Sequence, residues 1–274
     1  MAAAAEEAGA ESLWVSDHLV LLDQPTNDYP FTPDGAPSWD MTADYYESMT
    51  CCVAMAAATT TARVGTAVLI LPQRNVIEIA KTAATVDRLS GGRLDLGVGA
   101  GWNQAEMEAL QYDYRSRGKR FDEMLMALRD CWSGRPAAFR GETIEVPENT
   151  VLVPIPVQPN GVPMLVGGTS KPALRRAAEL GDGWLSIAFT STWDPDVQRV
   201  WIDDLEQRRG AHPSKPPRNV LKLHAGPDEV QVSLDLLDEV AEIGFDEVMI
   251  EPPFDHGLDE ATALVREASA RLRR

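Results

Sequence analysis

The sequence is poor in cysteine and in basic residues, and it has no long apolar run. Its 274 residues include three cysteines, Cys51, Cys52 and Cys131. This odd number, with two adjacent members, argues against a disulfide framework, because neighbouring cysteines bridge only with strain. No CxxC or Cys/His spacing indicates a metal site. We therefore expect a cytoplasmic protein with reduced cysteines.

Basic residues are outnumbered, with Lys+Arg 25 against Asp+Glu 42 and a formal net charge of −17. Such a chain repels phosphate backbones and anionic lipid surfaces, so we expect neither nucleic acid nor membrane as a partner. No apolar run reaches the roughly 18–20 residues of a membrane helix. The Ala-rich first ten residues lack the basic start of a signal peptide. With 44% hydrophobic and 24% charged residues, the composition is typical of a globular protein.

Short apolar segments alternate with helical patterns along the chain. After an opening that reads as a helix (MAAAAEEAGAES), the predicted strands are Ser12–His18, Ala62–Leu71, Leu94–Gly101, Pro163–Gly168, Gly183–Phe189, Val220–Gly226 and Glu247–Pro253. The predicted helices are Thr42–Thr60, Val76–Leu89, Arg117–Trp132, Lys171–Leu180, Asp194–Arg209, Pro227–Ile243 and Leu258–Leu272. This alternation predicts an α/β fold with a parallel sheet, open or closed.

Polar and Gly-rich segments follow several predicted strands, where (β/α)8 barrels place their sites, so we favour a barrel over an open sheet. No GxGxxG follows the first predicted strand, as a nucleotide-binding open sheet would require. We expect a single domain over residues 1–274. Two insertions interrupt it, Leu21–Asp40 and Arg135–Pro163, and the second is predicted to contain a hairpin (AFRGETIEV). The first is long enough to be a lid or binding loop.

The tripeptide Ser16–His18 (SDH) closes the first predicted strand. A histidine at a barrel mouth exchanges protons with a ligand carbonyl or donates a hydrogen bond to it. Asp17 would fix the His18 tautomer only if the chain turned back. A hydrogen-bonded pair that structures the next loop is an equally good interpretation of this short motif.

Gly167, Gly168, Thr169 and Ser170 follow a predicted strand and open a predicted helix. Glycines let the backbone approach a ligand, and amides at a helix start favour an anion, so this segment is a candidate phosphate loop. The alternative is an ordinary helix start with Ser170 as N-cap. A second Gly-rich strand end, Gly97–Asn103, places Trp102 where it would stack on a ligand or cover the barrel rim.

Other polar residues give weaker signals. Arg74 would meet an anionic group or pair with one of the many carboxylates. His224 lies on a predicted strand and would face the mouth, yet we prefer a structural role for it, as for His212 and His256. Composition and spacing alone thus lead to an α/β barrel with an anion site.

The order of four segments carries a family resemblance: SLWVSDH, YPFTPDG, the block Arg63–Trp102, and PMLVGGTSKPALRRAAELGDGW. Together they resemble the bacterial luciferase-like monooxygenase superfamily, and within it the oxidoreductases that depend on the deazaflavin coenzyme F420. The resemblance runs to about residue 190, and the tail fits only through GPDEV and GFDEVMIEPP. It implies a (β/α)8 barrel with the cofactor at the carboxyl-terminal mouth, and a homodimer.

Positions carried over from the family give expected site residues. Asp17 and His18 would lie near the cofactor ring as catalytic residues. A strand bulge at Thr66, Ala67 and Val68, with a non-prolyl cis peptide at Ala67–Val68, would back the ring. Ala100, Gly101 and Trp102 would flank the ribityl chain. The phosphate would be held by Gly167, Gly168, Thr169 and Ser170.

The resemblance predicts hydride transfer between the deazaflavin and a small organic substrate, with His18 as proton or hydrogen-bond donor. The scarcity of Lys and Arg clusters argues against sugar phosphates as substrates. One alternative is an FMN-dependent monooxygenase that uses reduced flavin, oxygen and a separate reductase. Another is a non-catalytic barrel that binds a flavin or deazaflavin. The residues do not identify the substrate.

The resemblance also implies a strand before the opening helix, where this sequence has none. A late start codon or a truncation would explain seven predicted strands in place of eight. The alternative is an open barrel with an exposed edge between the strands Ser12–His18 and Glu247–Pro253.

Overall fold

The computed structural model describes residues 1–22, 27–32, 35–37, 39–210, 217–226 and 229–272. Parts of the expected insertion 21–40 and of the expected helix 227–243 lie outside these residues, as does His212. Among the described residues, no helix is long and apolar enough to cross a membrane. Cys51, Cys52 and Cys131 are free thiols.

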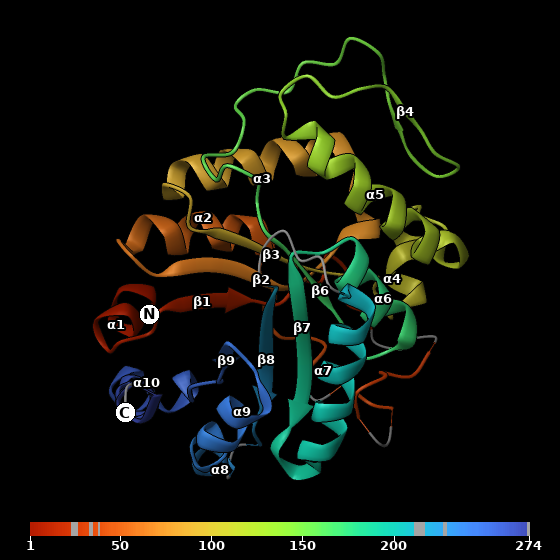
Figure 1. Ribbon diagram of the computed structural model, residues 1–274. Coiled ribbons are helices and arrows are strands. Elements are labelled where there is room, and N and C mark those ends of the chain that lie inside the picture. Colours follow the sequence, from red (N-terminus) through yellow and green to blue (C-terminus); the bar gives the residue numbers. More distant parts are fainter. Residues whose placement is uncertain (23–26, 33–34, 38, 211–216, 227–228, 273–274) are drawn as a thin grey trace. The chain divides into compact units, whose positions relative to one another are not determined.

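Strands and helices alternate along the chain (Figure 1). The strands are β1 (Ser12–Val15), β2 (Arg63–Ile70), β3 (Leu94–Gly99), β4 (Phe139–Arg140), β5 (Glu145–Val146), β6 (Met164–Gly167), β7 (Gly183–Phe189), β8 (Arg218–His224) and β9 (Glu247–Met249). The helices are α1 (Ala2–Glu7), α2 (Ser48–Ala58), α3 (Val76–Ser90), α4 (Gln104–Ala109), α5 (Arg117–Cys131), α6 (Lys171–Glu179), α7 (Pro195–Arg209), α8 (Val230–Asp235), α9 (Leu237–Ile243) and α10 (Leu258–Leu272). Short 3-10 turns are η1 (Leu71–Gln73), η2 (Tyr114–Ser116), η3 (Thr190–Thr192) and η4 (Phe254–His256).

Seven strands form one sheet in the order β1-β2-β3-β6-β7-β8-β9, and β4 and β5 form a separate hairpin. All seven predicted strands are confirmed, and so is the hairpin. Two helix predictions need correction, and the structure has one further helix. The helix predicted at 42–60 begins only at Ser48, because the Glu47 carboxylate accepts the Thr50 amide (2.7 Å) and acts as its N-cap. The helix predicted at 227–243 is divided into α8 and α9 at Leu236. Helix α4 was not predicted.

The chain forms two compact units. The central unit comprises Val15–Ala54 and Thr66–Pro163. Its helix α3 begins at the N-cap Asn75, whose side chain accepts two backbone amides, and buries Val76, Ile79 and Ala83. Trp132 packs at the end of α5 and donates its indole N–H to the Ala80 carbonyl of α3 (3.1 Å). The hairpin β4–β5 projects beyond α5 (Figure 1).

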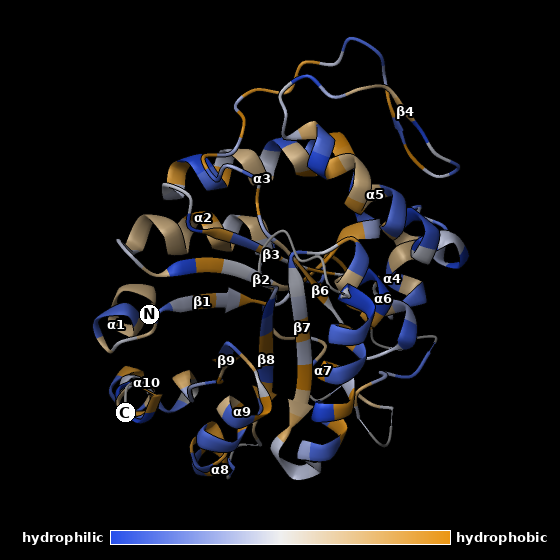
Figure 2. Ribbon diagram, in the orientation of Figure 1, coloured by the Kyte–Doolittle hydropathy of each residue, from blue (hydrophilic) through white to orange (hydrophobic). Residues whose placement is uncertain are grey.

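The C-terminal unit comprises Met1–Trp14, Met55–Gly65 and Met164–Arg274. Its strands β6, β7, β8 and β9 are parallel, so their carboxyl ends lie at one edge. Helices α6 and α7 carry hydrophilic and hydrophobic residues on different sides, as helices that cover a sheet do (Figure 2). Trp184 of β7 is fully buried against Phe245.

Candidate functional site

A buried histidine–glutamate pair is the main polar feature of the central unit. His18 Nδ1 lies 2.8 Å from Glu106 Oε2, and the two side chains are only 7% and 0% exposed. The other oxygen, Oε1, accepts the backbone amides of Leu19 (2.7 Å) and Val20 (3.3 Å). Glu106 is thus held by the residues that follow His18 and by the imidazole itself.

These contacts determine the protonation of the pair. Burial by itself would raise the pKa of Glu106, but the hydrogen bond and charge of His18 and the two amides outweigh it and lower the pKa. An ionised carboxylate only accepts hydrogen bonds, so the proton lies on Nδ1 of His18. In the neutral ring the other nitrogen, Nε2, is then a hydrogen-bond acceptor.

Glu106 lies on the six-residue helix α4, which starts directly after the Gly-rich end of β3. The Asn103 side chain caps this helix by accepting the Glu106 amide (3.3 Å). The spacing Asn-x-x-Glu resembles a capping box and is the sequence signal for this helix. The signal does not predict that the glutamate reaches His18.

Asp17 is directed away from the imidazole of its neighbour. Its carboxylate accepts Arg74 Nη2 (2.8 and 3.0 Å), the Ile70 amide (2.9 Å) and the Ser48 hydroxyl (3.0 Å). Burial raises the pKa of Asp17, and these three donors oppose the rise. Glu106, and not Asp17, orients His18, so the geometry gives Asp17 a positioning role between β1 and the end of β2. Arg74 accordingly pairs with a carboxylate, which was one of its two expected roles.

Aromatic rings surround His18. Its imidazole lies 5.5 Å from the Tyr45 ring, 5.7 Å from Trp39 and 6.1 Å from Trp102. Tyr29 contacts both Trp39 (5.1 Å) and Trp102 (5.3 Å). The described part of the insertion 21–40 therefore contributes Tyr29 and Trp39 to an aromatic enclosure of the histidine, which lowers the local polarity.

The expected non-prolyl cis peptide is present in β2, between Ala67 and Val68. Thr66 Oγ1 donates to the Gly97 carbonyl of β3 (2.8 Å). A Cβ atom on Gly99 would lie 2.6 Å from Val68 Cγ2. The Val68 side chain therefore leaves no room for a Cβ atom at position 99.

A second close approach follows β3. A Cβ atom on Gly101 would lie 2.7 Å from Ile70 Cγ2. The next residue, Trp102, uses its carbonyl to accept the Tyr114 hydroxyl (3.0 Å) while its ring joins the aromatic enclosure. The central unit thus brings together Asp17, His18, Thr66, Ala67, Val68, Ala100, Gly101 and Trp102 on neighbouring segments. Their roles toward a cofactor stay predictions.

Several buried polar atoms in this region have no hydrogen-bond partner among the described residues. They are Trp39 Nε1, Gln73 Nε2 and Oε1, Arg74 Nη1 and Asn103 Nδ2. Each follows β1, β2 or β3, and most are donors. A buried unpaired donor costs about 1–3 kcal/mol, so such atoms favour an acceptor-rich ligand. A flavin or deazaflavin ring carries carbonyl and nitrogen acceptors and fits this set.

The predicted phosphate loop lies in the C-terminal unit, between β6 and α6. Ser170 Oγ accepts the Ala173 amide (3.3 Å) and caps α6, which agrees with the structural interpretation of this residue. The Gly168 carbonyl accepts the Trp184 indole N–H (2.8 Å). Gly167, Gly168, Thr169 and Ser170 do begin a helix after a parallel strand, and their binding of phosphate stays a prediction.

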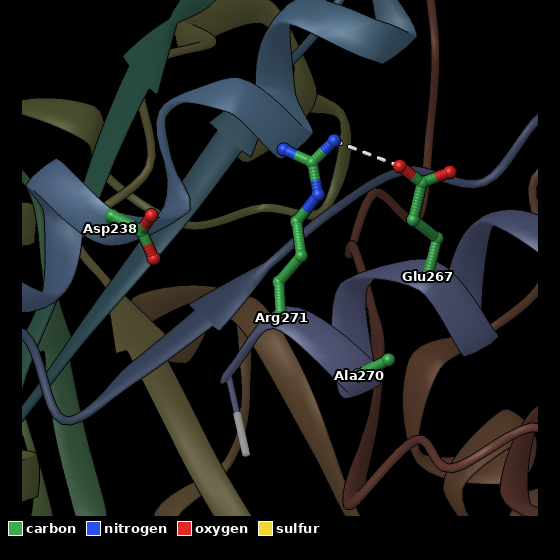
Figure 3. Close-up of a pocket in the computed structure, with 4 residues that line it drawn as sticks. All are labelled: Asp238, Glu267, Ala270 and Arg271. Carbon is green, nitrogen blue, oxygen red and sulfur yellow. Dashed lines mark hydrogen bonds and ion pairs between the residues drawn. The ribbon is translucent and has the colours of Figure 1, made fainter. Parts of the chain in front are cut away.

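A surface hollow in the C-terminal unit is lined by Asp238 of α9 and by Glu267, Ala270 and Arg271 of α10 (Figure 3). Arg271 pairs with Glu267 (2.8 Å) and with Asp235 (2.9 Å), so its charge is already compensated. Among the described residues, no group of three or more His, Cys, Asp or Glu side chains is arranged to hold a metal ion.

Comparison with known proteins decides the family. Residues 1–229 match the family model of luciferase-like monooxygenases. The chain belongs to this family. An uncharacterised protein of Mycobacterium tuberculosis is 36% identical over 185 residues, which cover 68% of this chain and 63% of that protein, less than two thirds of its length. A second M. tuberculosis protein is 30% identical over 98% of this chain and 91% of its own length.

Relatives with named activities use two different cofactors. An FMNH2-dependent dimethylsulfone monooxygenase of Pseudomonas putida is 30% identical over 61% of this chain and 45% of its own length. An F420-dependent glucose-6-phosphate dehydrogenase of Amycolatopsis mediterranei is 29% identical over 66% of this chain and 50% of its own length. Family members are thus oxidoreductases of both cofactor types.

Solved structures show the fold. An F420-dependent secondary alcohol dehydrogenase superposes with a TM-score of 0.74 at 17% identity, covering 97% of this chain and 93% of its own. A monooxygenase of Streptomyces bottropensis gives 0.72 at 18% identity, covering 99% and 90%. The α/β barrel class of the luciferase-like proteins is confirmed.

Proposed function

We propose that this protein is an oxidoreductase that uses the deazaflavin coenzyme F420 to transfer a hydride to or from a small organic substrate. The observation that carries the proposal is the buried pair of His18 and Glu106. Reduction of a carbonyl leaves an oxyanion that needs a proton, and oxidation of an alcohol releases one. A buried imidazole with an ionised carboxylate behind it is suited to both steps.

The coenzyme, when bound, supplies or accepts a hydride at C5 of its ring. His18 transfers the proton to or from the substrate oxygen. Glu106 stabilises the imidazolium form, from which Nε2 donates a proton to the substrate oxygen during reduction. In the reverse direction neutral Nε2 accepts the alcohol proton. The aromatic enclosure excludes water and strengthens these electrostatic interactions.

The residues that would hold the ring are those of the close strand ends. Gly99 and Gly101 let the side chains of Val68 and Ile70 in β2 pack closely against the end of β3. The unpaired donors on Asn103 and Trp39 would meet ring acceptors. Gly167–Ser170 would take the phosphate, as the family resemblance implies. The F420-dependent relative supports this choice of cofactor.

A second candidate is an FMN-dependent monooxygenase, which the relative from Pseudomonas putida favours. The same histidine would then protonate an oxygen atom derived from O2. This reaction requires oxygen and a source of reduced flavin, whereas the proposed hydride transfer requires neither.

Titration of the purified protein with F420 and with FMN tests the proposal. We expect tighter binding of F420, and hydride transfer from chemically reduced F420 to a ketone or enone without oxygen. Tighter binding of FMN with product formed only in the presence of oxygen would overturn the proposal and support the monooxygenase. Binding without transfer to any carbonyl, imine or enone would show a non-catalytic barrel.

A further inference from the structure

Three rings of the aromatic enclosure stand around His18 at different angles. The Trp39 plane is inclined to the imidazole by only 33°, whereas the Tyr45 and Trp102 planes meet it at 75° and 80°. The three aromatic residues are half-buried, so each keeps part of its ring surface open to a ligand. The face of an aromatic ring is negative, and rings that surround one place from several sides bind organic cations.

The part of the chain that supplies most of this enclosure contains no lysine or arginine. Residues 1–62 include ten aspartates and glutamates, and the first basic residue is Arg63. Three aspartates adjoin enclosure rings in the sequence, as the pairs Asp28–Tyr29, Trp39–Asp40 and Asp44–Tyr45. The aspartates are exposed, while the rings are buried or half-buried. The rings thus turn inward, and the carboxylates lie at the rim of the enclosure.

Two arginines contact residues next to the enclosure, and both are held by other groups. Arg74 pairs with the Asp17 carboxylate (2.8 Å). Arg117 donates to the carbonyls of Gly101 (3.2 Å) and Tyr114 (3.1 Å), and its guanidinium lies over the Tyr114 ring. The rim carboxylates therefore determine the sign of the local charge, and they repel an anion and attract a cation.

Glu106 is a second, independent reason to expect a positively charged ligand. Its side chain is 0% exposed, and its lowered pKa keeps the carboxylate ionised. Of the described side chains, only His18 offers Glu106 a positive charge, and only while the imidazole is protonated. A buried anion beside a neutral imidazole attracts a cation. Nε2 of the neutral ring can accept a hydrogen bond from an N–H group of that cation.

We propose that the substrate of the His18 site carries a positively charged nitrogen, which the rings of the aromatic enclosure hold and the aspartates of its rim attract. The identification of this ligand as the substrate rests on the proposed oxidoreductase function. The charged nitrogen serves recognition, and Trp39 and Tyr45 are specificity-determining residues. Phosphates and carboxylates are rejected, and uncharged compounds of the same shape bind more weakly.

Three ketones that differ in charge test this inference by binding. 1,1-Dimethyl-4-oxopiperidinium and 4,4-dimethylcyclohexanone have the same shape, because a quaternary nitrogen in one replaces a quaternary carbon in the other. 4-Oxocyclohexanecarboxylate is the anionic counterpart. Isothermal titration calorimetry measures the dissociation constants, with and without F420. We expect the cation to bind at least about tenfold more tightly than the uncharged ketone, and no binding of the anion.

Two variants of Trp39 test the contribution of the ring. Trp39→Leu removes an aromatic face, whereas Trp39→Phe keeps one. We expect the preference for the cation over the uncharged ketone to fall below about threefold in Trp39→Leu and to stay above about fivefold in Trp39→Phe. Equal preferences in the two variants would show that the ring does not contact the charge.

The double variant Asp40→Asn/Asp44→Asn tests the rim. Asparagine keeps the side-chain oxygen that accepts the Thr42 amide from Asp40 (2.8 Å), so the local turn is preserved. We expect the cation to bind about three- to tenfold more weakly at low ionic strength, and the uncharged ketone to bind equally well. Glu148→Gln removes a charge from an exposed residue just after β5 and is the matched control, with unchanged binding of all three ketones.

Three binding results would overturn the inference: equal affinity for the cation and its uncharged counterpart, anion binding as tight as cation binding, or binding of none of the three ketones. Hydride transfer from chemically reduced F420 distinguishes this failure from failure of the proposed function. If the cation and the uncharged ketone are reduced with equal kcat/KM, the selectivity fails and the function stands. If the cation is preferred in binding but no carbonyl, imine or enone accepts hydride, the function fails and the cation site stands.

Discussion

Two histidine–glutamate pairs, one in each compact unit, have the same Nδ1-to-carboxylate geometry in different surroundings. In the central unit, the side chains of His18 and Glu106 are 7% and 0% exposed. In the C-terminal unit, those of His224 and Glu251 are 18% and 43% exposed. A buried pair excludes water and retains a strong electrostatic interaction, whereas an exposed pair is screened. The comparison teaches that the same pair of groups interacts strongly where it is buried and weakly where water screens it.

The largest expected effect separates the roles of the two histidines. His18→Ala removes the proton donor, so we expect kcat to fall about 10²–10⁴-fold with little change in the dissociation constant of the cofactor. His224→Asn should leave kcat unchanged. Steady-state kinetics together with a cofactor titration measures both effects. Equal turnover in His18→Ala and the wild-type protein would remove His18 from the chemistry.

The next effect concerns stability at the two carboxylates. Glu106→Gln loses charge-assisted hydrogen bonds to His18 and to two backbone amides, so we expect the free energy of unfolding to fall by about 2–3 kcal/mol. The exposed pair of His256 and Glu260 offers a matched control. Glu260→Gln should change the free energy of unfolding by less than about 0.5 kcal/mol. Urea denaturation measures both values. Equal losses in the two variants would contradict the assignment of Glu106 to a buried, fully used position.

Close approach of the backbone predicts a smaller effect. Gly99→Ala places a methyl group 2.6 Å from the stiff side chain of Val68 and should cost about 1–3 kcal/mol. It should also weaken cofactor binding if the strand ends hold the ring. Gly226→Ala in the C-terminal unit meets only ordinary contacts, the nearest at 3.5 Å, and is the control. A Gly99→Ala protein of wild-type stability would show that the strands separate easily.

The smallest expected effect is a dependence on pH. The pKa of Glu106 is below its usual 4.5 in the folded protein. As the pH falls, the unfolded chain therefore takes up this proton before the folded protein does. The contribution of Glu106 to the free energy of unfolding is complete above pH 4.5, and it is lost as the pH falls through the pKa of the folded state. Unfolding free energies between pH 6 and pH 3 should fall less steeply in Glu106→Gln than in the wild-type protein. Identical slopes would contradict the direction of this shift.

Much of the fold was predictable because apolar periodicity marks buried strands and amphipathic helices. Helix α4 escaped prediction because six residues are too few to show a period. The partner of His18 could not be read from the sequence, because Glu106 lies 88 residues away and only tertiary folding brings it close. The neighbouring Asp17 was the obvious candidate. Adjacent residues of an extended segment point to opposite sides, which is why Asp17 meets Arg74 and not the imidazole.

The pair of His224 and Glu251 is a second case in which the sequence did not predict the partner. The sequence places His224 on its strand, but its partner Glu251 lies just beyond the next strand and its stacking partner Phe189 lies on the preceding one. Register between strands determines such neighbours, and a single sequence does not reveal it. Residue types at strand ends therefore indicate where a site lies, and the structure is needed to show which groups act together.

The central claim is that His18 supplies the proton for hydride transfer that needs no oxygen. The most direct measurement is anaerobic stopped-flow oxidation of bound, reduced F420 by a ketone, in the wild-type protein and in His18→Asn. We predict rapid oxidation in the wild-type protein and a rate at least about 100-fold lower in the variant, at equal cofactor affinity. Equal rates in the two proteins, or oxidation that begins only when oxygen is admitted, would contradict the account.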